Sequence, residues 1–148
     1  IEESVHLTFF PHPEEKYILN DEAEKRWEKI FALKIRVNIA LEQARKNKII
    51  GHSLESHVII KIFDENLYQL LIDLKDDLMD FLIVTSVTLE KDSLKNVAEE
   101  DKTYGYTVIA EKASGNKCGR CWKYYEKTET SEEDKALCPR CSEIINQI

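Results

Sequence analysis

The chain has 148 residues, of which 43% are hydrophobic and 33% are charged, and its formal net charge is −7. This composition is typical of a folded protein and excludes an intrinsically disordered chain. No apolar run approaches the roughly 18 residues that a transmembrane helix needs, so we expect no membrane contact. No secretory signal is visible, and the first residue is Ile rather than Met, so we expect a piece of a longer or processed chain.

The charge is unevenly distributed along the chain. Residues 64–101 contain eleven acidic and three basic residues, a balance of −8, whereas residues 21–50 contain eight basic and five acidic residues, a balance of +3. Residues 117–127 contain four basic and one acidic residue, again +3. The negative total argues against non-specific nucleic-acid binding, but it conceals two basic segments. For residues 21–50 a solvated helix face is the simpler explanation.

An arm over residues 4–13 is predicted to be extended and to end at its prolines, and a long helix is predicted to follow it. Asn20 or Asp21 can cap this helix, and Glu24 would complete a capping box with Asp21. We expect the helix to continue to about Lys48. Its apolar stripe, interrupted by one lysine, consists of Trp27, Ile30, Val37, Leu41 and Ala44.

A small α/β layer is predicted next. Residues 57–63 are rich in β-branched side chains and indicate a strand. Residues 64–80 indicate a helix, and its apolar face would carry Leu67, Leu71, Leu74 and Leu78. Residues 81–90 and 103–113 indicate two further strands, separated by a polar loop over residues 91–101. Strand–helix–strand order favours a right-handed crossover, and we expect the third strand to join the sheet as a hairpin partner.

All four cysteines lie in two Cys-x-x-Cys pairs, Cys118 with Cys121 and Cys138 with Cys141, separated by sixteen residues. This spacing is typical of zinc sites. Each turn points two thiolates at one centre, and two such turns complete the tetrahedron that Zn²⁺ accepts. Four thiolates leave no position for water, so we expect one structural zinc ion per chain. Gly119 is expected to ease the first turn.

Two other interpretations of the cysteines remain open. Two disulfides would require an oxidising compartment, which no signal in the sequence indicates. A redox-active pair is the second alternative, although two pairs at this separation fit it poorly. The zinc interpretation also has a physical basis, because residues 113–148 contain few core-forming side chains. So small a unit needs the free energy of metal binding to fold.

Cations and aromatic rings are interspersed with the cysteines. Cations for phosphate and flat rings for bases are what a single-stranded RNA surface needs. We therefore expect RNA contacts from Arg120, Trp122, Lys123, Tyr124 and Arg140. The alternative for Trp122 is a place in the interior of the ribbon. Arg36 and Arg45 on the long helix are weaker candidates.

The motifs KCGRCW and LCPRC resemble the zinc ribbon of bacterial-type isoleucyl-tRNA synthetases. The segments ESVHLTFFP and RVNIALEQARKNKIIGHSLESHVII resemble the end of that family's anticodon-binding helical domain and its continuation. The resemblance covers nearly the whole chain, but over residues 64–112 it rests on pattern rather than on individual residues. It implies a cytoplasmic, monomeric enzyme that joins isoleucine to its tRNA using ATP, with this region binding the tRNA.

The family's two ATP-site signatures, of the types His-x-Gly-His and Lys-Met-Ser-Lys-Ser, are not found in this sequence. We therefore expect the chain to contain no catalytic or cofactor-binding residues, and ATP to bind in the rest of the synthetase. The remainder of the synthetase and isoleucine tRNA are the expected partners. The acidic residues 64–101 would then face away from the RNA.

The predicted fold is α+β: a long N-terminal helix, a small α/β layer with a three-stranded sheet, and a C-terminal zinc ribbon. Residues 1–50 would end the anticodon-binding domain, residues 51–112 would form the small α/β domain, and residues 113–148 would form the ribbon.

Two other functions were weighed against the synthetase. Formamidopyrimidine-type DNA glycosylases end in a similar ribbon, but their nucleophile is an N-terminal proline, which the sequence IEES does not supply. A free-standing zinc-ribbon interaction module is the second alternative. It leaves the segment VNIALEQARKNKIIGHSLE unexplained.

Overall fold

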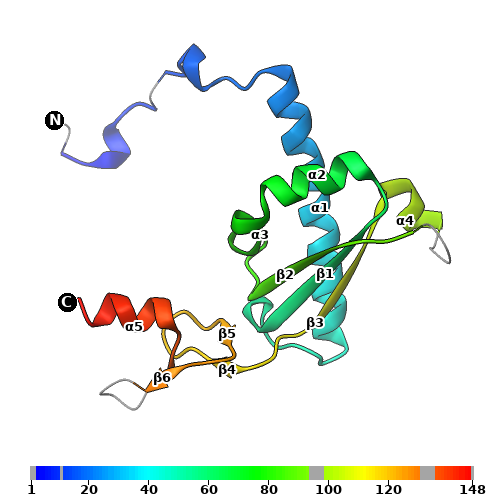
Figure 1. The fold of residues 1–148 in the computed structure, drawn as a ribbon. Coiled ribbons are helices and arrows are strands. Elements are labelled where there is room, and N and C mark those ends of the chain that lie inside the picture. The colour runs from blue at the N-terminus through cyan, green and yellow to red at the C-terminus, as the bar shows by residue number, and fades with distance from the viewer. Residues whose placement is uncertain (1–2, 11, 94–98, 131–135, 148) are drawn as a thin grey trace.

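The computed structural model describes residues 3–10, 12–93, 99–130 and 136–147, and it has the predicted α+β architecture (Figure 1). A detached N-terminal arm leads into the long helix α1 (Asp21–Lys46), which is followed by a three-stranded sheet with two short helices and then by a small ribbon. The arm predicted over residues 4–13 is not fully extended, because it contains the single-turn 3₁₀ helix η1 (Val5–Leu7). A second one, η2 (Glu15–Tyr17), lies between the arm and α1.

Helix α1 begins at a cap made by Asn20. Its side chain accepts a hydrogen bond from the backbone N–H of Ala23 at 2.8 Å, so the predicted capping box of Asp21 and Glu24 is replaced by a simpler cap. The helix ends at Lys46, two residues earlier than predicted. Lys48 adopts a left-handed backbone conformation (φ 58°) and closes the last turn, a place usually taken by glycine.

The buried stripe of α1 differs from the prediction at two positions, Trp27 and Leu33. It consists of Ile30, Leu33, Val37, Leu41 and Ala44. Leu33 is fully buried, whereas Trp27 is 39% exposed and packs against the rings of Phe31 and Phe81. Lys34 interrupts the stripe as predicted, but its Nζ donates to the Phe81 carbonyl (2.9 Å) and lies over the Phe81 ring. The helix is therefore rotated so that its aromatic residues lie at the edge of the core.

The crossover unit has the predicted order, with different boundaries. Strand β1 (Ser56–Ile62) runs parallel to β2 (Ser86–Lys91). The single helix predicted over residues 64–80 is broken at Leu74 into α2 (Glu65–Asp73) and α3 (Lys75–Leu82). The second strand therefore begins later than residue 81, because α3 continues through Leu82 and Ile83 then takes a left-handed conformation that ends it.

The third strand joins the sheet at an unexpected edge. Strand β3 (Tyr106–Lys112) pairs antiparallel with β1, so the order is β2-β1-β3 and the predicted hairpin is wrong. Helix α4 (Glu99–Tyr104) lies in the connection and is tied to α1 by a 2.7 Å ion pair between Asp101 and Arg36. Part of the loop predicted over residues 91–101 lies outside the described residues.

The helix and the sheet share one hydrophobic core. Alternate residues of β1, including Val58, Ile60 and Ile62, are buried in the same cluster as the stripe of α1 and the leucines of α2 and α3. The boundary predicted after residue 50 therefore does not separate two cores. Whether residues 1–50, 51–112 and 113–148 are distinct domains stays a prediction.

The 3₁₀ helix η3 (Ser53–Glu55) links α1 to β1, and the chain after β3 folds into the ribbon (Figure 1). The ribbon consists of two small hairpins and a helix, namely β4 (Asn116–Lys117) with β5 (Tyr124–Tyr125), β6 (Glu129–Thr130) with β7 (Ala136–Leu137), and α5 (Pro139–Ile145). Gly115, just before β4, has φ 94°, and a Cβ there would lie 2.4 Å from the carbonyl oxygen of Tyr125.

Leu33 lies in the core that α1 shares with the sheet and with α2 and α3. Replacing it by Ala is expected to lower the free energy of unfolding of this helix–sheet unit by about 2–5 kcal/mol, because the change leaves a cavity in the shared core. The matched control is Ile35→Ala on the opposite face of α1, where the side chain is 62% exposed and the expected change is within about 0.5 kcal/mol. Urea unfolding of both variants makes the comparison, and equal losses would show that α1 does not belong to this core.

Gly115→Ala is expected to weaken the ribbon selectively. The left-handed conformation alone costs an L-residue about 1–2 kcal/mol, and the contact with Tyr125 backbone adds to it, so zinc affinity should fall by about tenfold or more. Gly51→Ala is the control, because its Cβ would meet only the carboxylate end of Glu55 at 3.6 Å. Competition with a zinc chelator measures the zinc affinity of both variants. An unchanged zinc affinity of the Gly115 variant would show that a side chain at this position does not strain the ribbon.

Candidate metal centre

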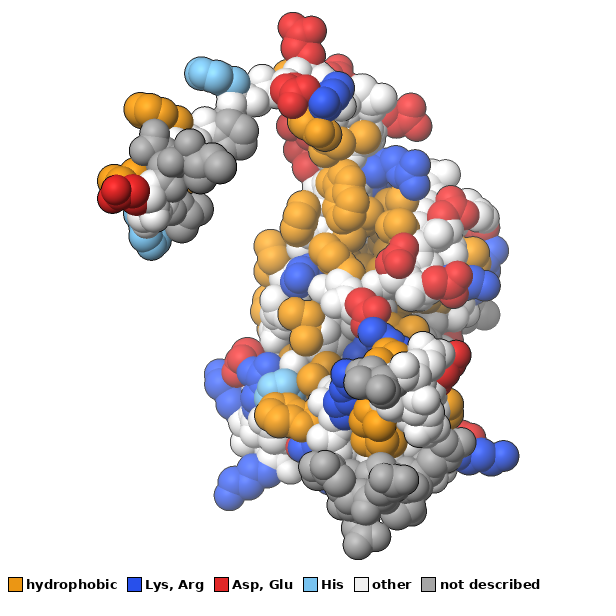
Figure 2. All heavy atoms as spheres, turned by 90° about the vertical axis from the view of Figure 1, so that its left-hand side faces the viewer, with side chains coloured by type: hydrophobic (Ala, Val, Ile, Leu, Met, Phe, Trp, Pro, Cys, Tyr) orange, Lys and Arg blue, Asp and Glu red, His pale blue; other side chains and the backbone are white. Residues whose placement is uncertain are grey.

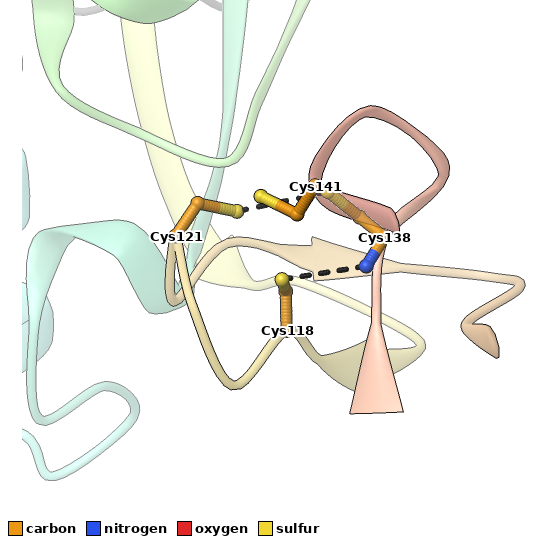
Figure 3. A group of neighbouring side chains, drawn as sticks. All are labelled: Cys118, Cys121, Cys138 and Cys141. Carbon is orange, nitrogen blue, oxygen red and sulfur yellow. Dashed lines mark hydrogen bonds between the residues drawn. The ribbon is translucent and has the colours of Figure 1, made fainter. Parts of the chain in front are cut away.

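The four cysteines converge on one point from two parts of the ribbon (Figure 3). All four sulfur atoms lie within 4.8 Å of one another, and all four residues are free thiols. Cys118 and Cys138 are fully buried, and together with Cys141 and Leu137 they form a small core that is separate from the main one. Tyr125 packs against this cluster.

The backbone of the first turn positions Cys118 and Cys121 between β4 and β5. The N–H of Cys118 donates to the Lys123 carbonyl at 2.9 Å, and the N–H of Trp122 donates to the Cys118 carbonyl at 3.0 Å. The left-handed residue of this turn is Trp122 (φ 66°). Gly119 therefore does not ease the turn as predicted; its N–H donates to the Ala136 carbonyl and joins the two hairpins.

The second pair is connected to the first through sulfur. Cys138 immediately precedes α5, and Cys141 lies within it. The backbone N–H of Cys138 donates to Sγ of Cys118 at 3.3 Å, and the sulfurs of Cys121 and Cys138 are 3.9 Å apart. Four sulfurs held around one zinc ion at about 2.3 Å would be roughly 3.8 Å apart. The cluster therefore has the size and the donor set of a structural zinc site.

The thiols differ in their tendency to ionise. Burial by itself raises the pKa of Cys118, but three backbone N–H groups, led by that of Cys121, donate to its thiolate and bring the pKa down to about 6. Burial raises the pKa of Cys141 to about 12 and also raises that of Cys121. Above pH 6 the metal-free cluster therefore holds one ready thiolate, and metal binding must displace protons from Cys121 and Cys141. Metal affinity should accordingly fall as the pH falls.

Trp122, Arg120 and Arg140 lie on the surface of the ribbon. Trp122 is 54% exposed, so the alternative that it fills the ribbon interior is wrong. Lys117 Nζ lies over its ring, 5.4 Å from the centroid, and the ring of His52 approaches edge-on at 6.5 Å between centroids. The side chains of Arg120 and Arg140 are exposed. An accessible ring with cations around it is thus present at the first turn.

Lys123 and Tyr124 lie elsewhere, between the ribbon and the layer. The Lys123 side chain is only 14% exposed, and its Nζ forms an ion pair with Asp80 of α3. The half-buried Tyr124 donates its backbone N–H to the Thr85 hydroxyl at 3.0 Å. The Lys123 hydrogen bond and charge, with a further contribution from Arg140, hold the pKa of Asp80 below its usual value.

Sequence reasoning missed two residues of this region, His52 and Asp80. Lys117 belongs to the basic segment 117–127 that the sequence singled out, and the fold places its ammonium group over the Trp122 ring. His52 and Asp80 gave no signal at all, because they come next to the ribbon only through the fold. The two weaker candidates on α1 have acidic partners, since Arg36 pairs with Asp101 and Arg45 with Glu42.

The ribbon is similar to a known family of zinc-binding domains. Residues 115–144 match the family described as "Zinc finger found in FPG and IleRS". The match and the four converging thiols together show that the chain takes one zinc ion, as predicted. No helix of the described residues combines the length and the apolar character needed to cross a membrane.

The whole chain is similar to curated proteins named isoleucine–tRNA ligase. The protein from Natranaerobius thermophilus is 38% identical over 97% of this chain and 16% of its own length. The protein from Fervidobacterium nodosum is 36% identical over 97% of the chain and 15% of its own length, and that from Fervidobacterium pennivorans is 42% identical over 72% of the chain. This chain thus spans about a sixth of the length of the relatives it matches.

These similarities discriminate between the alternatives raised by the sequence. The glycosylase alternative accounts only for the ribbon, whereas the ligase similarity also covers the helix and the sheet that precede it. A free-standing ribbon does not account for that upstream similarity either. Because the similarity extends over nearly the entire chain, from the arm to the ribbon, the chain is similar throughout to the C-terminal part of isoleucine–tRNA ligases.

Proposed function

We propose that the chain is the tRNA-binding part of an isoleucine–tRNA ligase, an enzyme that joins isoleucine to its tRNA using ATP. The observation that supports this function best is the exposed ring of Trp122 with Lys117 over it and Arg120 beside it in the chain. The chemistry with ATP would take place in the remainder of the enzyme. We further propose that this enzyme is cytoplasmic and acts as a monomer.

The surface of the ribbon has the chemistry that a single-stranded part of tRNA requires. An exposed indole offers a flat apolar face on which a base can stack. An Arg guanidinium can clamp a phosphate through two hydrogen bonds or stack on a base, which suits Arg120 and Arg140. Tyr124 is half-buried and is part of the proposed contact set.

The zinc ion has a structural role in this proposal. Cys118, Cys121, Cys138 and Cys141 would be its four ligands and would fill its coordination shell. The ion would then fix the turn that carries Arg120 and Trp122 next to the turn that carries Arg140. The ribbon's strands are two residues long, so without the ion little else would hold these side chains in place.

The remainder of the ligase is the second proposed partner. Helix α1 carries apolar side chains on its outer face as well as its inner one: Phe31, Ile35 and Ile39 are each more than half exposed. Figure 2 shows hydrophobic side chains gathered along the body between the N-terminal arm and the ribbon. Contiguous apolar surface of this kind marks contact sites. In the ligase it would pack against the part of the chain that lies outside this structure.

One zinc ion per chain is expected by metal analysis, and replacing any of the four cysteines by Ser should lower zinc affinity by more than tenfold. The ribbon should loosen while the layer keeps its fold, because the two have separate cores. Glu143→Ala, a change at an exposed position of α5 that removes no thiol, is the control. If a cysteine variant lost the helical signal of α1 at the same time as its zinc, the two cores would not be separate. If the Cys118 variant still bound zinc tightly, Cys118 would not be one of the ligands.

Trp122→Ala is expected to lower the affinity for isoleucine tRNA by about 1–3 kcal/mol through lost stacking. The double variant Arg120→Ala/Arg140→Ala should reduce the slope of log affinity against log salt by about 1.4, or roughly 0.7 for each phosphate contact. Arg45→Ala, which removes one positive charge from an ion pair on α1, is the control. Titrations of zinc-loaded protein at several salt concentrations measure both quantities. Unchanged affinity and slope would leave the ribbon with a structural role only.

A further inference from the structure

The ribbon is attached to the layer mainly through its first turn and β5. Among the described residues, three side-chain contacts connect the first turn and β5 to the layer. They are the ion pair of Lys123 with Asp80, the hydrogen bond from the Tyr124 N–H to Thr85, and the ring contact of Trp122 with His52. The chain itself makes a fourth link where the N–H of Ala113 donates to the Glu55 carbonyl at 2.7 Å. The same turn that carries the exposed tryptophan is therefore the part of the ribbon in contact with the rest of the protein.

Thr85 uses both capacities of its hydroxyl at this joint. It donates to the Leu54 carbonyl at 2.5 Å and accepts from the N–H of Tyr124 at 3.0 Å. A hydroxyl that donates in one direction and accepts from another fixes its own orientation. The bend before β2, the 3₁₀ helix η3 and strand β5 are thereby connected through a single side chain.

Lys123 is poorly placed to bind a phosphate. Its side chain is 14% exposed, whereas Asp80, its partner, is 68% exposed, so a phosphate approaching the ammonium group would meet a carboxylate first. The positive charge of Arg140 on α5 also contributes to lowering the pKa of Asp80. The charges at the joint therefore favour attachment of the ribbon over contact with an anion.

We propose that Lys123 is a positioning residue rather than an RNA contact: with Asp80 and Thr85 it fixes the ribbon on the layer and so determines how Trp122 and Arg120 face the tRNA. The consequence for RNA rests on the proposed function. The joint itself is a property of the free protein and can be tested without RNA.

The RNA test compares Lys123→Met, Asp80→Asn and the exchanged pair Asp80→Lys/Lys123→Asp, each loaded with zinc. If the pair positions the ribbon, both single variants should bind isoleucine tRNA about fivefold more weakly, equivalent to about 1 kcal/mol. The salt slope should stay unchanged, and the exchanged pair should recover most of the affinity. Asp77→Asn, which removes an equal charge from the exposed side of α3, is the control and should have no effect.

A direct contact between Lys123 and a tRNA phosphate would give a different set of results. If Lys123 contacts a phosphate, Lys123→Met should lower the salt slope by roughly 0.7, Asp80→Asn should leave binding equal or tighter, and the exchanged pair should bind worst. Any of these results would overturn the proposal.

A second measurement is amide hydrogen exchange at Tyr124 in the zinc-loaded protein without RNA. Asp80→Asn and Thr85→Val should each accelerate exchange of this N–H by about fivefold or more, whereas Asp77→Asn should not. Unchanged exchange in Asp80→Asn would overturn the positioning role. If the wild-type protein does not bind tRNA at all, the proposed function fails, and the exchange experiment alone decides whether the joint exists.

Discussion

The convergence of two distant turns on one point is the constraint on which the ribbon depends. Among the described residues of the ribbon, those buried after Gly115 are three cysteines, Leu137 and Ser142, with Tyr125 packed against the cluster. This is too little apolar surface to hold together two hairpins whose strands are two residues long. Metal coordination replaces the missing core, because one ion crosslinks four positions that the chain separates by as many as 23 residues. The turn that carries Cys118 and Cys121 requires a left-handed backbone conformation at Trp122, which is unfavourable for so bulky a residue.

That conformation also connects the metal centre to the surface. A turn that aims Cys118 and Cys121 inward leaves the side chain of Trp122 pointing away from the cluster, where it meets Lys117 and His52 instead of the ribbon core. The exposed ring is thus a consequence of how the thiols are positioned. The same short turn therefore carries two of the metal ligands and the ring that we propose for tRNA recognition.

The layer supplies the rigid support for this turn. Its core is continuous from α1 through β1 to α2 and α3. Of the residues that meet the ribbon, Asp80 belongs to α3, and Thr85 lies just before β2, where its N–H donates to the Ser56 carbonyl at 3.1 Å. The acidic residues of α2 and α3 are not all directed away from the ribbon, since Asp80 is neutralised by Lys123 at the joint. The net charge of the chain therefore says little about the field at the ribbon, which is determined by local pairs.

The sequence by itself determined the elements whose causes are local. The spacing of Cys118, Cys121, Cys138 and Cys141 predicted the metal cluster, and apolar periodicity predicted α1, the crossover unit and the three strands. Only the tertiary structure decided the rest. The edge at which β3 pairs, the rotation of α1 that buries Leu33 and exposes Trp27, and the removal of Lys123 from the surface by Asp80 all depend on contacts between residues far apart in the chain. Such contacts have no period or spacing in the sequence, because the geometry that creates them exists only once the layer has formed.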